Sequence, residues 1–152
     1  LTLGSKAKLY LITGRSPNGT SFRENKCTGY FSQSQSFTPS LSRSCPTPSQ
    51  ELTRTIQNYN DINETCEDVV SSIGQCQFKG TISTGNISSA CQNLITNTLS
   101  YNGCINAHKS DPDFYRDTWY VYLNRDQELW NNRHDEIRLL DENGKVVDVI
   151  SY

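Results

Sequence analysis

The sequence is poor in several residue types, and each shortage narrows what the protein can be. It has no methionine and only two histidines among 152 residues, and hydrophobic residues make up 34% of the chain. No hydrophobic run approaches the roughly 20 residues that a membrane-spanning helix needs. The net charge is -2, and Lys and Arg form no stripe interleaved with aromatic residues, which argues against dense contact with nucleic-acid phosphates.

The chain also lacks a secretory signal pattern and begins on Leu1, with a strand pattern almost at once. We therefore interpret it as a processed or excised segment of a longer protein. Charge is spread unevenly along it. Residues 1–26 contain five basic residues and one acidic residue, whereas residues 118–152 contain four basic and seven acidic residues. Solvated strand residues explain the basic segment better than a polyanion site does.

The six cysteines can form disulfide cross-links, which would stabilise a chain that has few hydrophobic residues for its core. The closest two are ten residues apart in the sequence. Zinc sites use close pairs such as C-x2-C, so we expect no metal, and an even set within one polar stretch predicts three disulfides and an oxidising compartment. The sequence leaves the pairing open. Our preferred set is nested: Cys66–Cys76, Cys45–Cys91 and Cys27–Cys104.

The two ends of the chain have the clearest β pattern. Predicted strands cover residues 6–13, 119–123, 136–141 and 145–152, with a shorter strand opening at Phe22. Asn143-Gly144 lies between the last two strands, and both residues tolerate the positive φ of a tight hairpin turn. These segments are bulky and apolar, which favours β-strands.

The long middle of the chain, residues 27–116, contains all six cysteines and a different pattern. Residues 32–44 are rich in serine, which predicts an exposed loop. Start signals and apolar spacing predict three helices: one that starts within Pro46–Ser49 and reaches about Tyr59, one from Asn63 to Ile73, and one from about Ser89 to Tyr101. We expect Asn102-Gly103 to end the third helix.

Three groups of polar residues could carry chemistry. They are His108 with Asp111 and Asp113, His134-Asp135-Glu136, and Asp126 with Glu128. The first could hold a cation, the second could do acid–base work, and the third could be a glycosidase pair. A turn, a solvated connection and a surface turn explain them better, because no nucleophile or regular ligand spacing accompanies them. We therefore assign no catalytic, cofactor-binding or metal-binding residue.

Aromatic side chains are concentrated near the C-terminus. A ligand-binding surface could use Trp119, Tyr120, Tyr122 and Trp130, although such residues more often form core and exposed edges of a sandwich. Three sites satisfy the N-glycosylation pattern, namely Asn18, Asn63 and Asn86. They matter only in a eukaryotic source.

Two stretches resemble the lamin tail domain family. ELWNNRHDEIRLLDENGKVVDVISY resembles its closing strands, with a Trp-Asn element, an apolar strand, Asp-x-x-Gly and a Val-rich last strand ending in Tyr. LTLGSKAKLYLITGRSPNG resembles its middle portion, where a Leu-x-x-Gly turn precedes a strand. The cysteine-rich middle looks like the insertion of a bacterial secreted group of these domains. The family's first strands have no counterpart in this sequence.

The resemblance implies an immunoglobulin-like antiparallel β-sandwich, incomplete at its N-terminus, with a disulfide-rich, mostly helical insertion. Residues 1–26 and 117–152 would form the sandwich, and residues 27–116 the insertion. The implied function is a non-catalytic binding or structural module of a secreted or cell-surface protein, which binds a protein or cell-surface component and needs no cofactor. The alternatives are a self-assembling surface polymer completed by strand donation, and a secreted hydrolase with a site between insertion and sandwich.

Overall fold

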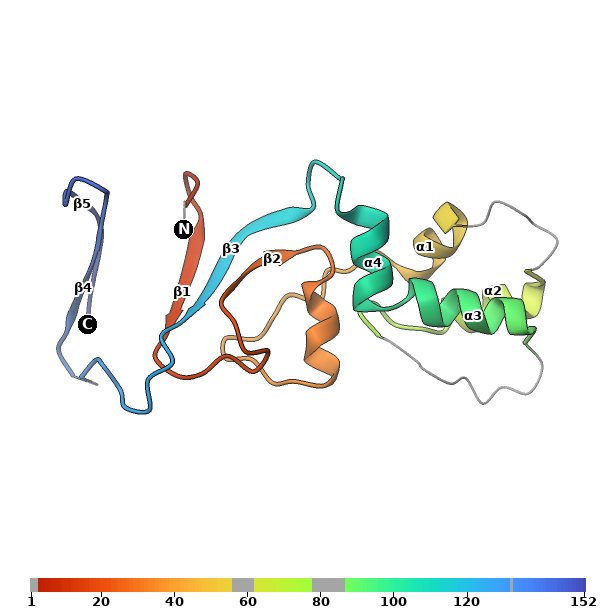
Figure 1. Cartoon of the computed structure of the whole chain (residues 1–152), viewed down its shortest axis with the longest axis horizontal. Coiled ribbons are helices and arrows are strands. Elements are labelled where there is room, and N and C mark those ends of the chain that lie inside the picture. Colours follow the sequence, from red (N-terminus) through yellow and green to blue (C-terminus); the bar gives the residue numbers. More distant parts are fainter. Residues whose placement is uncertain (1–2, 56–61, 78–86, 132) are drawn as a thin grey trace.

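The computed structural model describes residues 3–55, 62–77, 87–131 and 133–152. In chain order its elements are β1 (Lys8–Ile12), β2 (Phe22–Asn25), the 3-10 helix η1 (Thr28–Gln33), α1 (Pro48–Thr55), α2 (Glu64–Ser71), α3 (Ser89–Thr98), α4 (Tyr101–His108), β3 (Tyr115–Tyr122), β4 (Glu136–Leu140) and β5 (Val146–Ser151). The molecule is elongated, with α1 to α4 at one end and β4–β5 at the other (Figure 1). Within the described part, no helix is long and apolar enough to cross a membrane.

The two ends of the chain share a three-stranded sheet with the order β1-β3-β2. β1 pairs with β3 in parallel, from Lys8 opposite Thr118 to Ile12 opposite Tyr122. β2 pairs with the other side of β3 in the antiparallel sense. The prediction that distant segments meet in one sheet is therefore correct for these three strands.

The predicted immunoglobulin-like antiparallel sandwich is wrong. β4 and β5 pair only with each other, as a separate two-stranded antiparallel sheet, and the described residues close no sandwich. The pairing of β1 with β3 is also parallel rather than antiparallel. Apolar periodicity identifies a segment as a strand, but it contains no information on which strand becomes its neighbour. The sandwich was expected from the resemblance to lamin tail domains, and the sequence itself provided no strand pairing to check it.

One face of the three-stranded sheet carries an aromatic cluster. Tyr120 is 1% exposed, and its ring stacks on Phe22 with centroids 5.2 Å apart. Its hydroxyl donates to the Ser40 carbonyl at 3.1 Å. Phe37 and Leu41 are buried against it. The serine-rich loop is thus not simply exposed, because its few large apolar residues cover the sheet while most of its serines face solvent.

Three disulfides link the middle of the chain, and no cysteine is left over. Cys27–Cys104 is one of the three predicted pairs, and its Cα atoms are 5.8 Å apart. The other two predicted pairs, Cys66–Cys76 and Cys45–Cys91, are wrong, because the structure joins Cys45 to Cys76 and Cys66 to Cys91. Short sequence separation misled the prediction. Cys66 lies inside α2, whereas Cys76 lies beyond its C-terminal end, and a helix separates residues along its axis by about 1.5 Å each.

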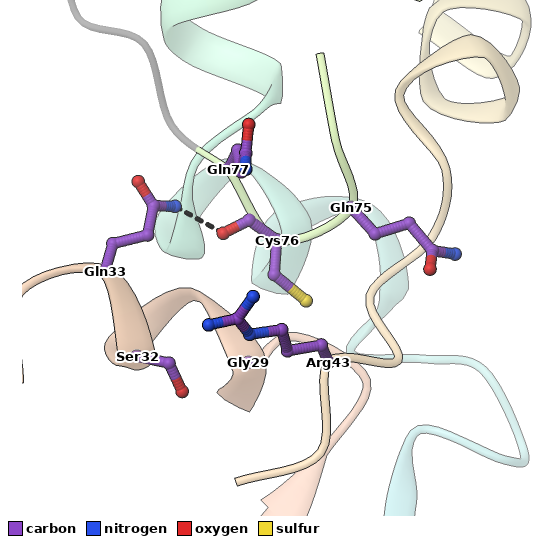
Figure 2. Close-up of a pocket in the computed structure, with 7 residues that line it drawn as sticks. All are labelled: Gly29, Ser32, Gln33, Arg43, Gln75, Cys76 and Gln77. Atoms are coloured by element: carbon purple, nitrogen blue, oxygen red, sulfur yellow. Dashed lines mark hydrogen bonds between the residues drawn. The ribbon is translucent and has the colours of Figure 1, made fainter. Parts of the chain in front are cut away.

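The Cys45–Cys76 disulfide is held by side chains around it. Gln33 of η1 donates its amide hydrogen to the Cys76 carbonyl (Figure 2). Gln75 donates to the Cys45 carbonyl at 3.2 Å. Gly29 packs so close that an added Cβ would lie 2.8 Å from the Ser42 carbonyl oxygen, so only glycine fits there. This disulfide therefore ties η1, the loop before α1 and the segment after α2 together.

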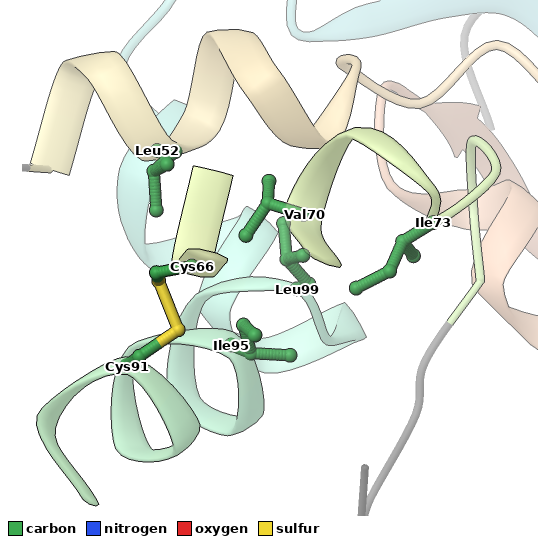
Figure 3. Packing of buried hydrophobic residues seen from close by; sticks show 7 residues of the cluster. All are labelled: Leu52, Cys66, Val70, Ile73, Cys91, Ile95 and Leu99. Carbon is green, nitrogen blue, oxygen red and sulfur yellow. A yellow bond between two sulfur atoms is a disulfide. The ribbon is translucent and has the colours of Figure 1, made fainter. Parts of the chain in front are cut away.

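The helical end has its own apolar core. It contains Leu52 from α1, residues from α2 and α3, and the Cys66–Cys91 disulfide (Figure 3). The side chain of Asn63 caps α2 by accepting from the Cys66 N–H at 3.0 Å, and Ser88 caps α3 in the same way at 3.1 Å from Cys91. These caps confirm the predicted starts of both helices.

The predicted third helix is two helices in the structure. α3 ends at Thr98, and α4 begins at Tyr101 with the Ser100 hydroxyl accepting from the Gly103 N–H at 3.0 Å. Gly103 therefore lies inside α4 instead of ending a helix. A Cβ at this position would lie 2.5 Å from the Thr98 carbonyl oxygen, so the sharp corner between the helices requires glycine. The predicted first helix runs in part into residues 56–59, which lie outside the described residues.

Candidate functional site

The four aromatic residues proposed as a ligand surface do not form one surface. Tyr120 is buried in the aromatic cluster, so it cannot contact a ligand from solvent. Tyr122 packs at the edge of the same cluster. Trp119 is the neighbour of Tyr120 on β3 and therefore lies on the opposite face of the sheet. Trp130 is half-buried in the connection between β3 and β4.

The face that carries Trp119 is apolar and lies outside the buried clusters of the described residues. The register places Leu9 beside Trp119 and Leu11 beside Val121. Leu11 is 38% exposed, and the other three are half-buried. We call these four residues the open face. Arg23 borders it, with its guanidinium carbon 5.7 Å from the Trp119 ring.

The most exposed apolar surface is the hairpin formed by β4 and β5. Seven of the ten exposed large hydrophobic residues found in the described part lie in residues 139–152: Leu139, Leu140, Val146, Val147, Val149, Ile150 and Tyr152. Every residue of β5 is exposed. Ile137 faces Ile150 across the hairpin, whereas Arg138 faces Val149 on the other side. Both faces of the hairpin therefore carry apolar side chains in contact with solvent.

The second notable site is a buried network around His108, at the C-terminal end of α4. The Nε2 atom of His108 lies 2.6 Å from Glu51 Oε1 on α1, and its Nδ1 atom lies 2.7 Å from Asp111 Oδ2. His108 is 5% exposed and Glu51 is 2% exposed. Lys26, just after β2, places its Nζ atom 3.0 Å from Asp111 and 2.5 Å from Asp113.

A cavity of about 490 Å³ lies beside this network, between the helices and the sheet. Residues from both parts line it, including Lys26 and Arg116 from the sheet side and Gln50 and Ser44 from the helical side. The sequence grouped His108 with Asp111 and Asp113, and the structure confirms that all three are close to one another. The sequence analysis missed Glu51, which is 57 residues away from His108 in the chain and looked like an ordinary residue of a helix start.

The charges of this network shift the pKa values of neighbouring groups. Hydrogen bonds to Asp113, and then to Asp111, raise the pKa of Lys26 against the opposing effect of its own burial. The Lys26 ammonium in turn lowers the pKa of Asp113. Burial, reinforced by the negative charge of Glu51, raises the pKa of Tyr30 to about 12. The pairing of Lys26 with Asp113 thus favours the charged form of both side chains.

The geometry around His108 suits a structural role better than catalysis. A general base must present a ring nitrogen to the substrate or to the nucleophile. Both ring nitrogens of His108 already lie within hydrogen-bond distance of carboxylates. Among the described residues, no group of three or more His, Cys, Asp or Glu residues is arranged to hold a metal ion. The network therefore joins α1, α4 and the start of β3 without a visible catalytic arrangement.

A smaller cavity, about 320 Å³, adjoins the Cys45–Cys76 disulfide (Figure 2). Arg43, Ser32 and three glutamines line it. Two of these glutamines hold the backbone on either side of the disulfide, as described above. The lining of this cavity combines polar side chains with Gly29 and Cys76.

The remaining polar groups predicted from the sequence lie on the surface. His134 is exposed, and Asp135 pairs its backbone with Tyr152 at the open end of the hairpin. Glu136 accepts a hydrogen bond from Arg138 on the same strand. Asp126 pairs with Arg15 at 3.1 Å in an exposed salt bridge. These contacts fit the solvated connections that the sequence favoured.

Comparison with known proteins identifies no relative of this chain. No family model matches it, and no curated protein or solved structure is significantly similar to it. The resemblance to lamin tail domains therefore stays a prediction that rests on the two sequence stretches alone.

Proposed function

We propose that this chain is a non-catalytic, extracytoplasmic binding module and that the β4–β5 hairpin is its binding element. The observation that carries the proposal is the exposure of apolar side chains on both faces of this hairpin. An isolated two-stranded hairpin is at best marginally stable in water, and contiguous exposed apolar surface usually marks an interaction site. A protein partner that covers the hairpin would stabilise it and would remove its apolar side chains from water.

The three disulfides support the location of this function outside the cytoplasm. Disulfides persist in oxidising compartments, and this chain has all six cysteines joined in the part that lies away from the hairpin. The stapled helical part would then act as a stable base beside the sheet. Such a division suits a secreted or cell-surface module that presents one element to a partner.

The cavity near His108 suggests a secreted hydrolase as the alternative function. This cavity does lie between the helices and the sheet, where such a site was expected. Its histidine, however, contacts a carboxylate at each ring nitrogen, and these contacts would have to break before the ring could accept a proton from a nucleophile. The binding module is therefore the better-supported function.

A capture experiment tests the proposal. The wild-type protein and a hairpin variant, Leu140→Ser/Ile150→Ser, are immobilised and exposed to extracellular material of the source organism. Leu129→Ser/Tyr115→Ser is the matched control, because Leu129 and Leu140 are each 51% exposed and Tyr115 and Ile150 are each 58% exposed. We expect wild type and control to retain a protein that the hairpin variant loses. Retention of the same proteins by all three would refute the hairpin as the binding element.

A further inference from the structure

We infer that the partner of the hairpin is a second copy of this chain, whose β1 edge and open face receive it. This inference rests on the proposed function and names the partner that the function leaves open. In it an outer strand of the hairpin of one copy pairs along the β1 edge of the other, and the apolar side chains of the hairpin lie beside those of the open face. A reciprocal exchange of two hairpins would give a closed dimer with two-fold symmetry.

Charge complementarity is the first argument for a second copy. The segment around β1 carries the exposed Lys6 and Lys8 and no acidic residue between residues 3 and 15, and the nearby Arg15 pairs with Asp126. The hairpin and its turn carry five acidic and two basic residues between residues 135 and 152. Two copies of the chain therefore present a basic receiving edge and an acidic hairpin to each other. Opposite charges across an interface steer association and disfavour other partners.

Backbone hydrogen bonding is the second argument. β1 is an edge strand, because β3 is its only neighbour in the described sheet. β4 and β5 form a two-stranded sheet, so each of them also has an outer edge. An exposed edge presents a row of N–H and C=O groups that can pair with another strand. The chain thus carries both halves of an edge-to-edge contact.

The apolar surfaces are the third argument. The open face presents Leu9, Leu11, Trp119 and Val121 to solvent on the side of the sheet that lacks the aromatic cluster. The hairpin presents Ile150 and its neighbours. In Figure 1 the hairpin stands beyond β1, at the end of the molecule away from α1 to α4. The helices therefore do not cover the outer edge of β1.

A charge-exchange experiment tests this inference on the full chain with its disulfides intact. Variant A, Lys6→Asp/Lys8→Glu, reverses the β1 side, and aspartate suits position 6, where φ is 65°. Variant B, Glu136→Lys/Asp148→Lys, reverses the hairpin. The control, Glu67→Lys/Asp68→Lys, makes the same charge change as variant B on exposed positions of α2. Sedimentation velocity from micromolar to near-millimolar protein measures self-association, and circular dichroism checks folding.

We expect the wild type and the control to self-associate, and variants A and B to do so at least about tenfold more weakly. An equimolar mixture of A and B should recover part of the association, because the reversed charges complement each other. A wild type that stays monomeric over the whole range overturns the inference, as does association that variants A and B leave unchanged. If the wild type is monomeric but the hairpin variant still loses a protein in the capture experiment, the inference fails while the proposed function stands.

Discussion

At the scale of single residues, the strongest polar contacts join segments that are far apart in the sequence. His108 contacts Glu51 across 57 residues and Asp111 across three. Since all three groups are withdrawn from solvent to a large degree, the imidazole and the carboxylates depend on one another for charge and hydrogen bonding. The network therefore contributes to holding α1 against α4 and against the turn before β3.

We predict that His108→Ala lowers the free energy of unfolding by about 3 kcal/mol, because it removes the imidazole from between two buried or partly buried carboxylates. Urea unfolding at neutral pH, followed by circular dichroism, measures the change. Asp113→Asn is the control within the same network, and it should have little effect because Asp113 is on the surface. An unchanged unfolding midpoint for His108→Ala would contradict a structural role for the network.

Local signals in the sequence predicted residue roles well where the partner is a near neighbour. The predicted helix starts were Asn63 and Ser89, and in the structure Asn63 and Ser88 cap these helices by accepting from an N–H three residues later. Glu51 escaped notice because its partner is distant and its neighbours fit an ordinary helix. Gly103 was misread as a helix end, since sequence alone does not show that its missing Cβ allows close approach to the Thr98 carbonyl.

At the scale of elements, two disulfides act on different loops of the chain. Cys66–Cys91 joins α2 to α3 across 25 residues, and Cys27–Cys104 joins η1 to α4 across 77 residues. All four cysteines are at most 1% exposed, so their loss would remove similar amounts of packing. The main difference between the two bonds is the length of unfolded chain that each one restricts.

We predict that replacing Cys27 and Cys104 by alanine costs about 4 to 5 kcal/mol, and that the same change at Cys66 and Cys91 costs about 3 to 4 kcal/mol, because the longer loop gains more entropy in the unfolded state. Thermal unfolding of both variants and the wild type shows which variant loses more stability. A lower stability for the variant without Cys66–Cys91 would show that packing between α2 and α3 outweighs loop length.

Elements were easier to predict than their arrangement. The bulky runs at both ends are strands, and the Asn143-Gly144 turn connects β4 to β5 with Gly144 at a φ of 79°. The partners of these strands were not predictable, because a period of two residues is the same for a core strand and for an exposed hairpin. The nested disulfide order failed for a related reason, since it ignored the length that α2 places between Cys66 and Cys76.

At the scale of the whole molecule, η1 connects the aromatic cluster on the sheet to the disulfide-linked cluster around Cys27–Cys104, because consecutive residues of η1 pack against each. Tyr30 belongs to the disulfide-linked cluster, and Phe31 packs against the sheet cluster and also against Tyr101 of α4, with ring centroids 4.4 Å apart. The resemblance assigned residues 27–116 to an insertion and residues 1–26 and 117–152 to the sandwich. The structure instead packs residues 31–41 onto the sheet, so we expect the two parts to unfold together.

The ionisation of two buried tyrosines can show whether the sheet and the helical part unfold together. Burial and the charge of Glu51 raise the pKa of Tyr30 to about 12, and burial, with a smaller effect of Glu24, raises the pKa of Tyr120. In the unfolded chain a tyrosine ionises near pH 10. Above that pH the unfolded state binds fewer protons than the folded state, so the stability that these two groups contribute is complete below pH 10 and falls as pH rises towards 12. For Tyr30 alone the loss is roughly 3 kcal/mol.

We therefore predict that Tyr30 and Tyr120 ionise in one late step that coincides with the loss of far-ultraviolet circular dichroism. Absorbance at the tyrosinate band during a rapid alkaline titration measures this step. Tyr30→Phe and Tyr120→Phe should each remove one tyrosine from the late step and make the variant less sensitive to alkali. Ionisation of Tyr120 while Tyr30 stays protonated would mean that the sheet opens alone and that η1 does not couple it to the helices.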